Sequence, residues 1–144
     1  MYNERVRVKR VSLENFRRFG KIEFEFDPKI TLISGANTSG KTTVLEAIFL
    51  LATGGSFRAE TVREMIKFNE TIARIQSLIT DHQPPATGHQ SPITLEVVLT
   101  PGEVQGKKVS KKKFLVNGVE KKKGEFAGKL LAVIFRPEDI RIIT

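Results

Sequence analysis

The feature that most constrains this 144-residue chain is the segment at 35–42, which reads Gly-Ala-Asn-Thr-Ser-Gly-Lys-Thr. The pattern Gly-x-x-x-x-Gly-Lys-[Ser/Thr] is a phosphate loop when a strand precedes it and a helix follows it. The apolar, β-branched run at 30–34 predicts a buried strand. Residues 41–52 contain no Gly or Pro and are followed by Gly54-Gly55, which predicts a helix with a stop signal. The motif and its flanks together predict an α/β fold with a phosphate-binding turn.

The residue types of the motif match the chemistry of a bound triphosphate. Gly35 and Gly40 let the backbone approach closely, and the helix N-terminus adds a partial positive charge. Lys41 is expected to reach the β- and γ-phosphates, the Thr42 hydroxyl to bind Mg²⁺, and Thr43 to contact the α-phosphate. A glycine-rich turn that binds nothing would leave a lysine at the positive end of a helix without a reason. The predicted site for ATP and Mg consists of Gly35, Ala36, Asn37, Thr38, Ser39, Gly40, Lys41, Thr42 and Thr43.

Composition limits the remaining possibilities. The absence of cysteine excludes a disulfide framework, a thiolate metal site and a cysteine nucleophile. The first residues lack the apolar core of a signal peptide, and the apolar stretch at 44–52 is too short to span a bilayer. We therefore predict a cytoplasmic protein without a membrane partner, in which residues 1–144 form part of one domain.

Outside the motif the chain reads mostly as strands. The alternating segments at 5–17 and 21–26 predict an antiparallel ribbon that leads into the phosphate loop. Asn117-Gly118 between two short apolar runs predicts a hairpin with a type I′ turn. Further predicted elements are a weak helix at 60–67, strands at 71–79, 93–100 and 130–135, a flexible loop at 81–92, and the first turn of a helix at 137–139.

The net charge of +8 is concentrated around this hairpin, where the segment 107–123 holds eight lysines and one glutamate. Two interpretations stay open. The cluster can neutralise DNA phosphates, which gives salt-sensitive binding that does not depend on sequence. It can equally keep an edge hairpin soluble, as lysines commonly do in natural sheets. The candidate DNA contacts are Lys111, Lys112, Lys113, Lys121, Lys122 and Lys123.

Arg17 and Arg58 are further candidates for phosphate contact, because each follows an aromatic residue that can anchor it. The alternative is a pair of ordinary surface arginines. Glu138 and Asp139 can lie near a bound Mg²⁺ or cap the helix that begins at Pro137. His82 and His89 lack partners for a metal site.

Several motifs together resemble one group of proteins. Asn15-Phe16-Arg17, the loop at 35–42 and the segment 44–48 (Val-Leu-Glu-Ala-Ile) resemble the SMC-like branch of ABC-type ATPases. Residues 55–58 (Gly-Ser-Phe-Arg) and 133–140 (Val-Ile-Phe-Arg-Pro-Glu-Asp-Ile) are similar to the RecF family of bacterial DNA replication and repair proteins. This resemblance covers nearly the whole chain.

The resemblance implies a phosphate-loop ATPase fold with a mixed sheet, the antiparallel N-terminal ribbon and the basic β-hairpin. It also implies ATP-dependent homodimers that bind single-stranded or gapped DNA, cooperate with recombination mediator proteins, serve the SOS response and hydrolyse ATP weakly. Two departures qualify it. Thr38 stands where the family often has Gly. The helical lobe, the Leu-Ser-Gly-Gly signature and the acidic Walker B strand are absent, so we expect a chain truncated before the helical lobe that binds nucleotide at best and contributes no catalytic residue of its own.

Two rival interpretations stay open. Another SMC-like ATPase of chromosome maintenance or defence would share the loop. A small phosphate-loop kinase would need an arginine-rich lid and an acceptor-binding Asp soon after the loop, whereas this chain has two antiparallel strands before the loop and a basic hairpin later in the chain.

Overall fold

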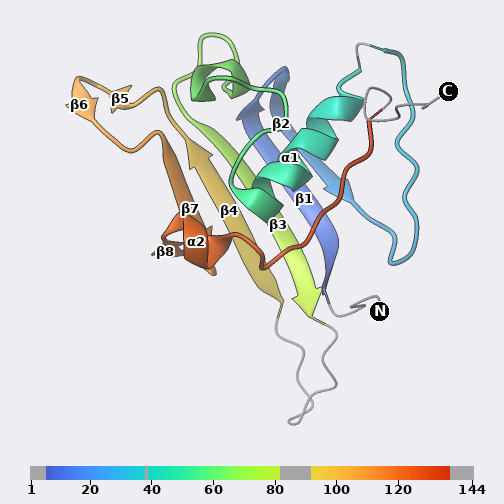
Figure 1. Ribbon diagram of the computed structural model, residues 1–144. Coiled ribbons are helices and arrows are strands. Elements are labelled where there is room, and N and C mark those ends of the chain that lie inside the picture. The colour runs from blue at the N-terminus through green and yellow to red at the C-terminus, as the bar shows by residue number, and fades with distance from the viewer. Residues whose placement is uncertain (1–5, 38, 82–91, 137–144) are drawn as a thin grey trace, which may run out of the picture.

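The computed structural model describes residues 6–37, 39–81 and 92–136, which form a six-stranded sheet with helices on one face (Figure 1). The strand order is β2-β1-β3-β4-β7-β8, and every pairing in this sheet is antiparallel. The elements of the described chain are β1 (Val6–Phe16), β2 (Phe19–Glu25), α1 (Lys41–Thr53), the 3₁₀ helix η1 (Val62–Met65), β3 (Ala73–Asp81), β4 (Ile93–Leu99), β5 (Glu103–Val104), β6 (Lys107–Lys108), β7 (Lys112–Val116), β8 (Val119–Lys121) and α2 (Lys123–Phe126).

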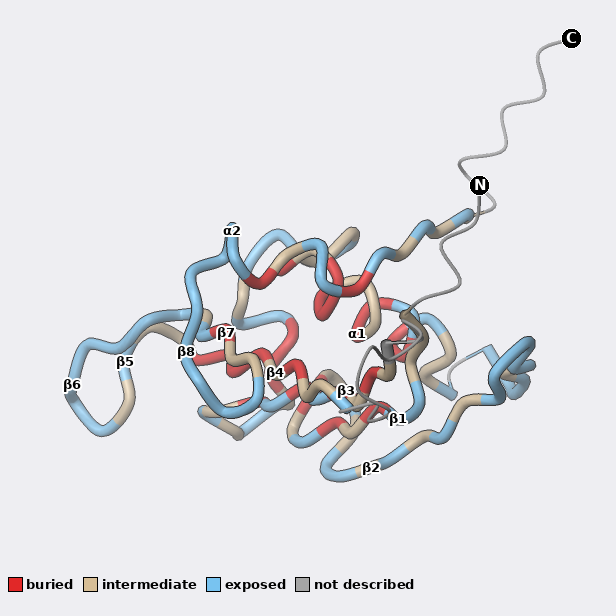
Figure 2. Tube along the Cα trace, turned by 90° about the horizontal axis from the view of Figure 1, so that it is seen from below, coloured by how far each residue is buried: buried red, intermediate tan, exposed pale blue. Residues whose placement is uncertain are grey.

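The hydrophobic core lies between the sheet and α1, where Figure 2 shows the buried segments gathered between the two layers. Helix α1 contributes Ala47, Leu50 and Leu51, which are fully buried. They pack with inward-facing residues of the central strands, such as Ile75 of β3 and Val97 of β4. Because burial of apolar surface is the main favourable term in folding, this layer fixes the position of α1 on the sheet. The short β5–β6 ribbon extends away from this core (Figure 2).

Several predictions of local structure are confirmed. β1 and β2 form the predicted antiparallel ribbon, and α1 ends at Gly54, which has a φ of 77°. β7 and β8 form the predicted hairpin, in which Asn117 and Gly118 have φ values of 50° and 78°. Positive φ at both central residues is the signature of a type I′ turn. The predicted strands at 71–79 and 93–100 correspond to β3 and β4.

The prediction of buried strands at 30–34 and 130–135 was wrong. Neither segment is a strand, and most of their large apolar side chains are exposed, with Leu32 at 87% and Phe135 at 84% relative exposure. An apolar run becomes a strand only where a neighbouring strand accepts its backbone hydrogen bonds. Among the described residues, neither segment has such a neighbour.

One predicted helix is shorter than expected, and other predicted features lie outside the described residues. The predicted helix at 60–67 is limited to the single turn of η1. The loop residues 82–91 with both histidines, and the turn at 137–139 with Glu138 and Asp139, lie outside the described residues, as does Thr38. Within the described part of the chain, no helix has the length and apolar character needed to cross a membrane.

Candidate functional site

The predicted phosphate loop ends at Gly40, which has a left-handed backbone conformation and directly precedes helix α1. Gly40 is the N-cap with a φ of 94°, and a Cβ atom there would lie 2.6 Å from Cζ of Phe19. Glycine is therefore required both by the backbone conformation and by the close approach of β2. The backbone N–H of Ser39 donates to the carbonyl of Ala36 at 2.9 Å, which closes the turn before the helix.

The N-terminus of α1 is open. No described side chain caps it, and its first turn contains no acidic residue. The first backbone N–H groups of a helix lack partners within the helix and carry the positive end of its dipole. Such a helix end favours an anion.

A small pocket of about 210 Å³ lies at this helix end. The Lys41 Nζ donates a hydrogen bond of 2.6 Å to the Gly35 carbonyl, so its ammonium group folds back across the loop. Thr42 is exposed, whereas Thr43 is buried. The pocket is lined by Arg18, Asn37, Gly40, Lys41, Thr42, Thr43 and Arg58.

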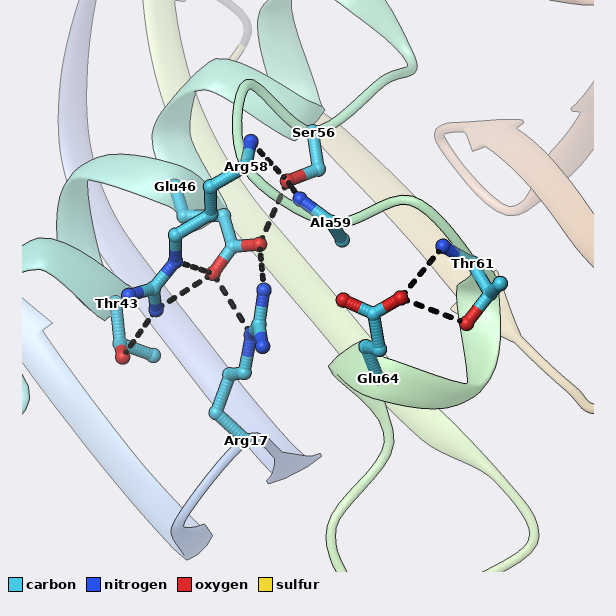
Figure 3. Close-up of polar contacts among 8 residues, drawn as sticks. All are labelled: Arg17, Thr43, Glu46, Ser56, Arg58, Ala59, Thr61 and Glu64. Atoms are coloured by element: carbon cyan, nitrogen blue, oxygen red, sulfur yellow. Dashed lines mark hydrogen bonds and ion pairs between the residues drawn. The ribbon is translucent and has the colours of Figure 1, made fainter.

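A buried carboxylate lies next to this pocket and joins two loops (Figure 3). Glu46 on α1 is fully buried and accepts two hydrogen bonds from Arg17, at 2.7 and 3.0 Å. It also accepts from Arg58 Nε at 2.9 Å and from the Ser56 hydroxyl at 2.7 Å. The Arg58 Nη2, which lies 2.8 Å from the same carboxylate, donates to the Thr43 hydroxyl at 2.9 Å. Two cations and a hydroxyl thus share one carboxylate beside the pocket.

These contacts determine the ionisation of Glu46. Burial raises the pKa of a carboxyl group, but hydrogen bonds from Arg17, Ser56 and Arg58 outweigh it and hold the pKa of Glu46 below its ordinary value. Glu46 is therefore a carboxylate at neutral pH. An unpaired buried charge would be costly, and the paired arrangement avoids that cost.

The turn that carries Arg17 has an unusual backbone. Asn15 and Arg17 have φ values of 51° and 53°, which non-glycine residues rarely adopt. The surrounding structure holds both residues: the Arg17 N–H donates to the Met65 carbonyl at 2.8 Å, and Asn15 Nδ2 donates to the Ile72 carbonyl at 3.2 Å. Strain of this kind is retained where neighbouring contacts specify it, and it commonly marks functional positions. Here it directs Arg17 toward Glu46.

The two arginines predicted to contact phosphate, Arg17 and Arg58, differ in their position relative to the pocket. Arg58 lines the pocket, but Arg17 does not and is turned toward Glu46. Arg18 lines the pocket and was not predicted. Glu46 was also missed, although a single acid within the apolar run 44–52 on a buried helix was a signal that could have found it.

The lysine cluster lies at the other end of α1. The Lys112 Nζ donates to the carbonyl of Gly54 at 3.1 Å, and Lys113 forms an ion pair with Glu120 at 3.3 Å. Burial lowers the pKa of Lys112, and the nearby charge of Lys123 lowers it further. The remaining lysines of the predicted DNA-binding set are exposed, namely Lys111, Lys121, Lys122 and Lys123.

Comparison with known proteins defines the class first. The AAA domain family matches residues 10–139, and the chain belongs to this family. A structure from work on ATP-driven dimerisation and DNA-stimulated activation of SMC ATPases superposes with a TM-score of 0.67 at 21% identity, over 95% of this chain and 85% of that one. At this identity the likeness shows the fold, and it confirms the predicted fold.

The particular similarity is to RecF, as the motifs predicted. The DNA replication and repair protein RecF of Caldanaerobacter subterraneus subsp. tengcongensis is 38% identical over 137 residues, covering 94% of this chain and 34% of the relative. RecF of Halalkalibacterium halodurans is 32% identical, with 94% and 33% covered. The structure of the recombination mediator protein RecF with ATP superposes with a TM-score of 0.76 at 33% identity, over 94% of this chain and 34% of that one. The chain thus spans about a third of the length of the RecF proteins it matches.

Proposed function

We propose that this chain is the ATP-binding portion of a RecF-type ATPase that acts on DNA in replication and repair. The observation that carries the proposal is the open N-terminus of α1, with Gly40 as a left-handed cap and Lys41 at the pocket. The similarity to RecF solved with ATP supports ATP as the anion that occupies it.

In this proposal the backbone N–H groups of residues 35–43 hold the phosphates, and Lys41 exchanges the Gly35 carbonyl for the β- and γ-phosphates. Arg18 and Arg58 line the same pocket and add positive charge. The exposed hydroxyl of Thr42 is a suitable ligand for Mg²⁺, which would neutralise phosphate charge. The described residues contain no cluster of three or more His, Cys, Asp or Glu that could hold a metal. In this proposal Mg²⁺ is bound by the Thr42 hydroxyl together with the phosphates.

We place the DNA contact at the lysine cluster. Lys112 is directed to the end of α1 and Lys113 is paired with Glu120, so exposed Lys111, Lys121 and Lys122 are the stronger candidates for phosphate contacts. The competing role of edge protection fits β8, which is the last strand of the sheet.

The wider activities belong to a full-length protein in this proposal. They are ATP-dependent homodimerisation, weak ATP hydrolysis, cooperation with mediator proteins and a part in the SOS response in the cytoplasm. The relatives are about three times as long as this chain. A different SMC-like ATPase is the second candidate, and the likeness in fold to a structure from work on SMC ATPases favours it over a small kinase.

Calorimetric titration of the 144-residue chain with Mg-ATP tests the nucleotide site. Lys41→Ala should weaken binding about a hundredfold, because it removes charge-assisted contacts to two phosphates. Lys9→Ala, at an exposed position on β1, is the matched control and should bind as the parent chain does. Equal affinity in Lys41→Ala would refute the site.

The DNA contact is tested by the salt dependence of binding to single-stranded and gapped oligonucleotides. Replacing Lys111, Lys121 and Lys122 by Gln should reduce the slope of log affinity against log salt by about one for each phosphate that the variant no longer neutralises. The control is Lys113→Gln, which removes a lysine already paired with Glu120. An unchanged slope in the triple variant would favour edge protection.

A further inference from the structure

We propose that Glu46 is a positioning residue of the nucleotide site, whose buried carboxylate holds Arg58 against the first turn of α1. The inference rests on the proposed ATP site and concerns a residue that has no direct place in it. The Glu46 side chain is fully buried, with no exposed surface, so it cannot touch a ligand in the pocket itself. Its effect on a ligand must pass through the groups that it binds.

Arg58 is the group best placed to carry this effect. Its side chain retains 34% exposure and lines the pocket, while its Nε and one terminal nitrogen lie 2.9 and 2.8 Å from the same Glu46 oxygen. The guanidinium also donates to the Thr43 hydroxyl, on the third residue of α1. Arg58 is therefore fixed at two points, one on Glu46 and one at the phosphate-binding end of the helix (Figure 3).

The loop that carries Arg58 depends on the same carboxylate. The Ser56 hydroxyl donates to Glu46 at 2.7 Å and accepts from the backbone N–H groups of Arg58 and Ala59, at 3.1 and 2.9 Å. Ser56 thereby transmits the position of Glu46 to the backbone of 56–59. Glu46 therefore positions both parts of Arg58: it binds the guanidinium directly and the backbone through Ser56.

Arg17 has a different part in the cluster. It binds Glu46 through two nitrogens, but it does not line the phosphate pocket. It supplies the second positive charge that keeps the buried carboxylate ionised. Removing Arg17 leaves Glu46 paired with Arg58, so the guanidinium at the pocket should keep its place.

The decisive experiment is a double-mutant cycle on Mg-ATP affinity of the 144-residue chain. Glu46→Gln leaves the amide with one acceptor oxygen and an NH₂ group that faces a guanidinium, so Arg58 should lose its fixed position. We expect Glu46→Gln and Arg58→Gln each to weaken binding about tenfold, which matches the loss of one charge-assisted interaction. The double variant should be no weaker than Arg58→Gln, because Glu46 acts through Arg58.

Arg17→Gln is the matched control, since it removes the other arginine of the same carboxylate. Its affinity should stay within about twofold of the parent chain, although its stability falls. Urea unfolding of each variant identifies conditions in which all are folded, so that affinity is compared between folded proteins. NMR signals of the arginine Nε–H groups give a readout without nucleotide: the Arg58 signal should be protected in the parent chain and in Arg17→Gln, and exchange rapidly in Glu46→Gln.

Three results would overturn the inference. The first is Mg-ATP affinity of Glu46→Gln equal to that of the parent chain. The second is a double variant whose loss of affinity is the full sum of the two single losses. The third is an Arg17→Gln variant whose affinity falls as far as that of Arg58→Gln. The proposed site and the role of Glu46 can fail separately. Unchanged Mg-ATP binding in Lys41→Ala refutes the site. Weakened binding in Lys41→Ala together with unchanged binding in Glu46→Gln refutes only the role of Glu46. If the Gln variant at 46 does not fold, the Arg58→Gln and Arg17→Gln pair decides, because equal losses contradict the proposal.

Discussion

The two ends of helix α1 have the same kind of cap and opposite surroundings. Gly40 and Gly54 are both left-handed, with φ values of 94° and 77°. At the C-terminal end the protein supplies the partners: Gly54 N–H donates to Leu50, Gly128 N–H donates to Ala52, and Lys112 donates to Gly54. At the N-terminal end no described side chain does so.

This difference indicates which end of α1 is available to a ligand. Orphan carbonyls at a helix C-terminus attract cations, and Lys112 meets that preference from within the chain. Orphan N–H groups at the N-terminus attract anions, and the described part of the chain offers none there. The carbonyl groups at the C-terminal end of α1 therefore have partners within the protein. The N–H groups at its N-terminal end, about 20 Å away at 1.5 Å per residue, have no side-chain partner among the described residues and are available to an anion.

The largest effect should come from the charged cluster beside the open end. Glu46→Ala leaves Arg17 and Arg58 next to a buried position without a counterion, and we expect a loss of about 3–5 kcal/mol in the free energy of unfolding. Urea denaturation at neutral pH measures it. A loss below about 1 kcal/mol would mean that the cluster is as weak as an exposed ion pair.

The same cluster predicts a pH dependence. Because the folded-state pKa of Glu46 is lowered, its stabilising contribution is complete above the ordinary glutamate pKa and is lost as pH falls through the folded pKa. Urea midpoints measured from neutral to acidic pH should decline more steeply for the parent chain than for Glu46→Gln. Parallel declines would show that Glu46 does not drive acid unfolding.

The next effect concerns the cap at the open end. Gly40→Ala places a Cβ atom 2.6 Å from the Phe19 ring in a left-handed conformation, so we expect a loss of about 2 kcal/mol or more and weaker Mg-ATP binding. Gly20→Ala is the matched control, because a Cβ atom at that position would meet no atom within 4 Å and the change in stability should be less than about 0.5 kcal/mol. Similar results for the two variants would contradict the required approach of Phe19.

A smaller effect is expected at the closed end. Gly54→Ala also strains a left-handed residue, but its Cβ would approach Lys123 and Phe114 at 3.1 Å, and the lysine chain can move. We expect a loss of about 1 kcal/mol in unfolding free energy. Mg-ATP affinity should not change. Weakened binding in Gly54→Ala would show that the two ends of α1 are coupled.

The smallest effect should follow from Lys112→Met. The lost bond to Gly54 is offset by removal of a charge that is unfavourable to bury, so the net loss should be about 1 kcal/mol or less. The lowered pKa of Lys112 means that the folded state releases its proton first. The stability of the parent chain should therefore rise relative to Lys112→Met as pH increases through that pKa. Parallel pH profiles would exclude a buried ammonium at this position.

The sequence predicted what depends on local pattern. The helix after the loop, the antiparallel ribbon and the Asn117-Gly118 turn require only neighbouring residues, and all three are confirmed. The runs at 30–34 and 130–135 were wrong as strands, because strand formation depends on a partner that periodicity cannot reveal.

The candidate site was predictable to the same extent. The motif located the loop and Lys41, since backbone geometry and residue type coincide there. It could not show that Arg17 turns to Glu46 while Arg18 turns to the pocket, because that choice depends on the left-handed backbone of the turn. The backbone of the turn and the pairing of Arg17 with Glu46 together leave Arg18 as the one of these two arginines that lines the pocket.

The sharing of one carboxylate by two arginines also limits how this chain can evolve. Loss of Arg17 or Arg58 leaves a balanced pair, and a later change of Glu46 then leaves one positive charge without a counterion. Loss of Glu46 first leaves two like charges facing a buried site, which is the most costly intermediate. Mutational paths through this cluster therefore have a preferred order, with an arginine changing before the glutamate.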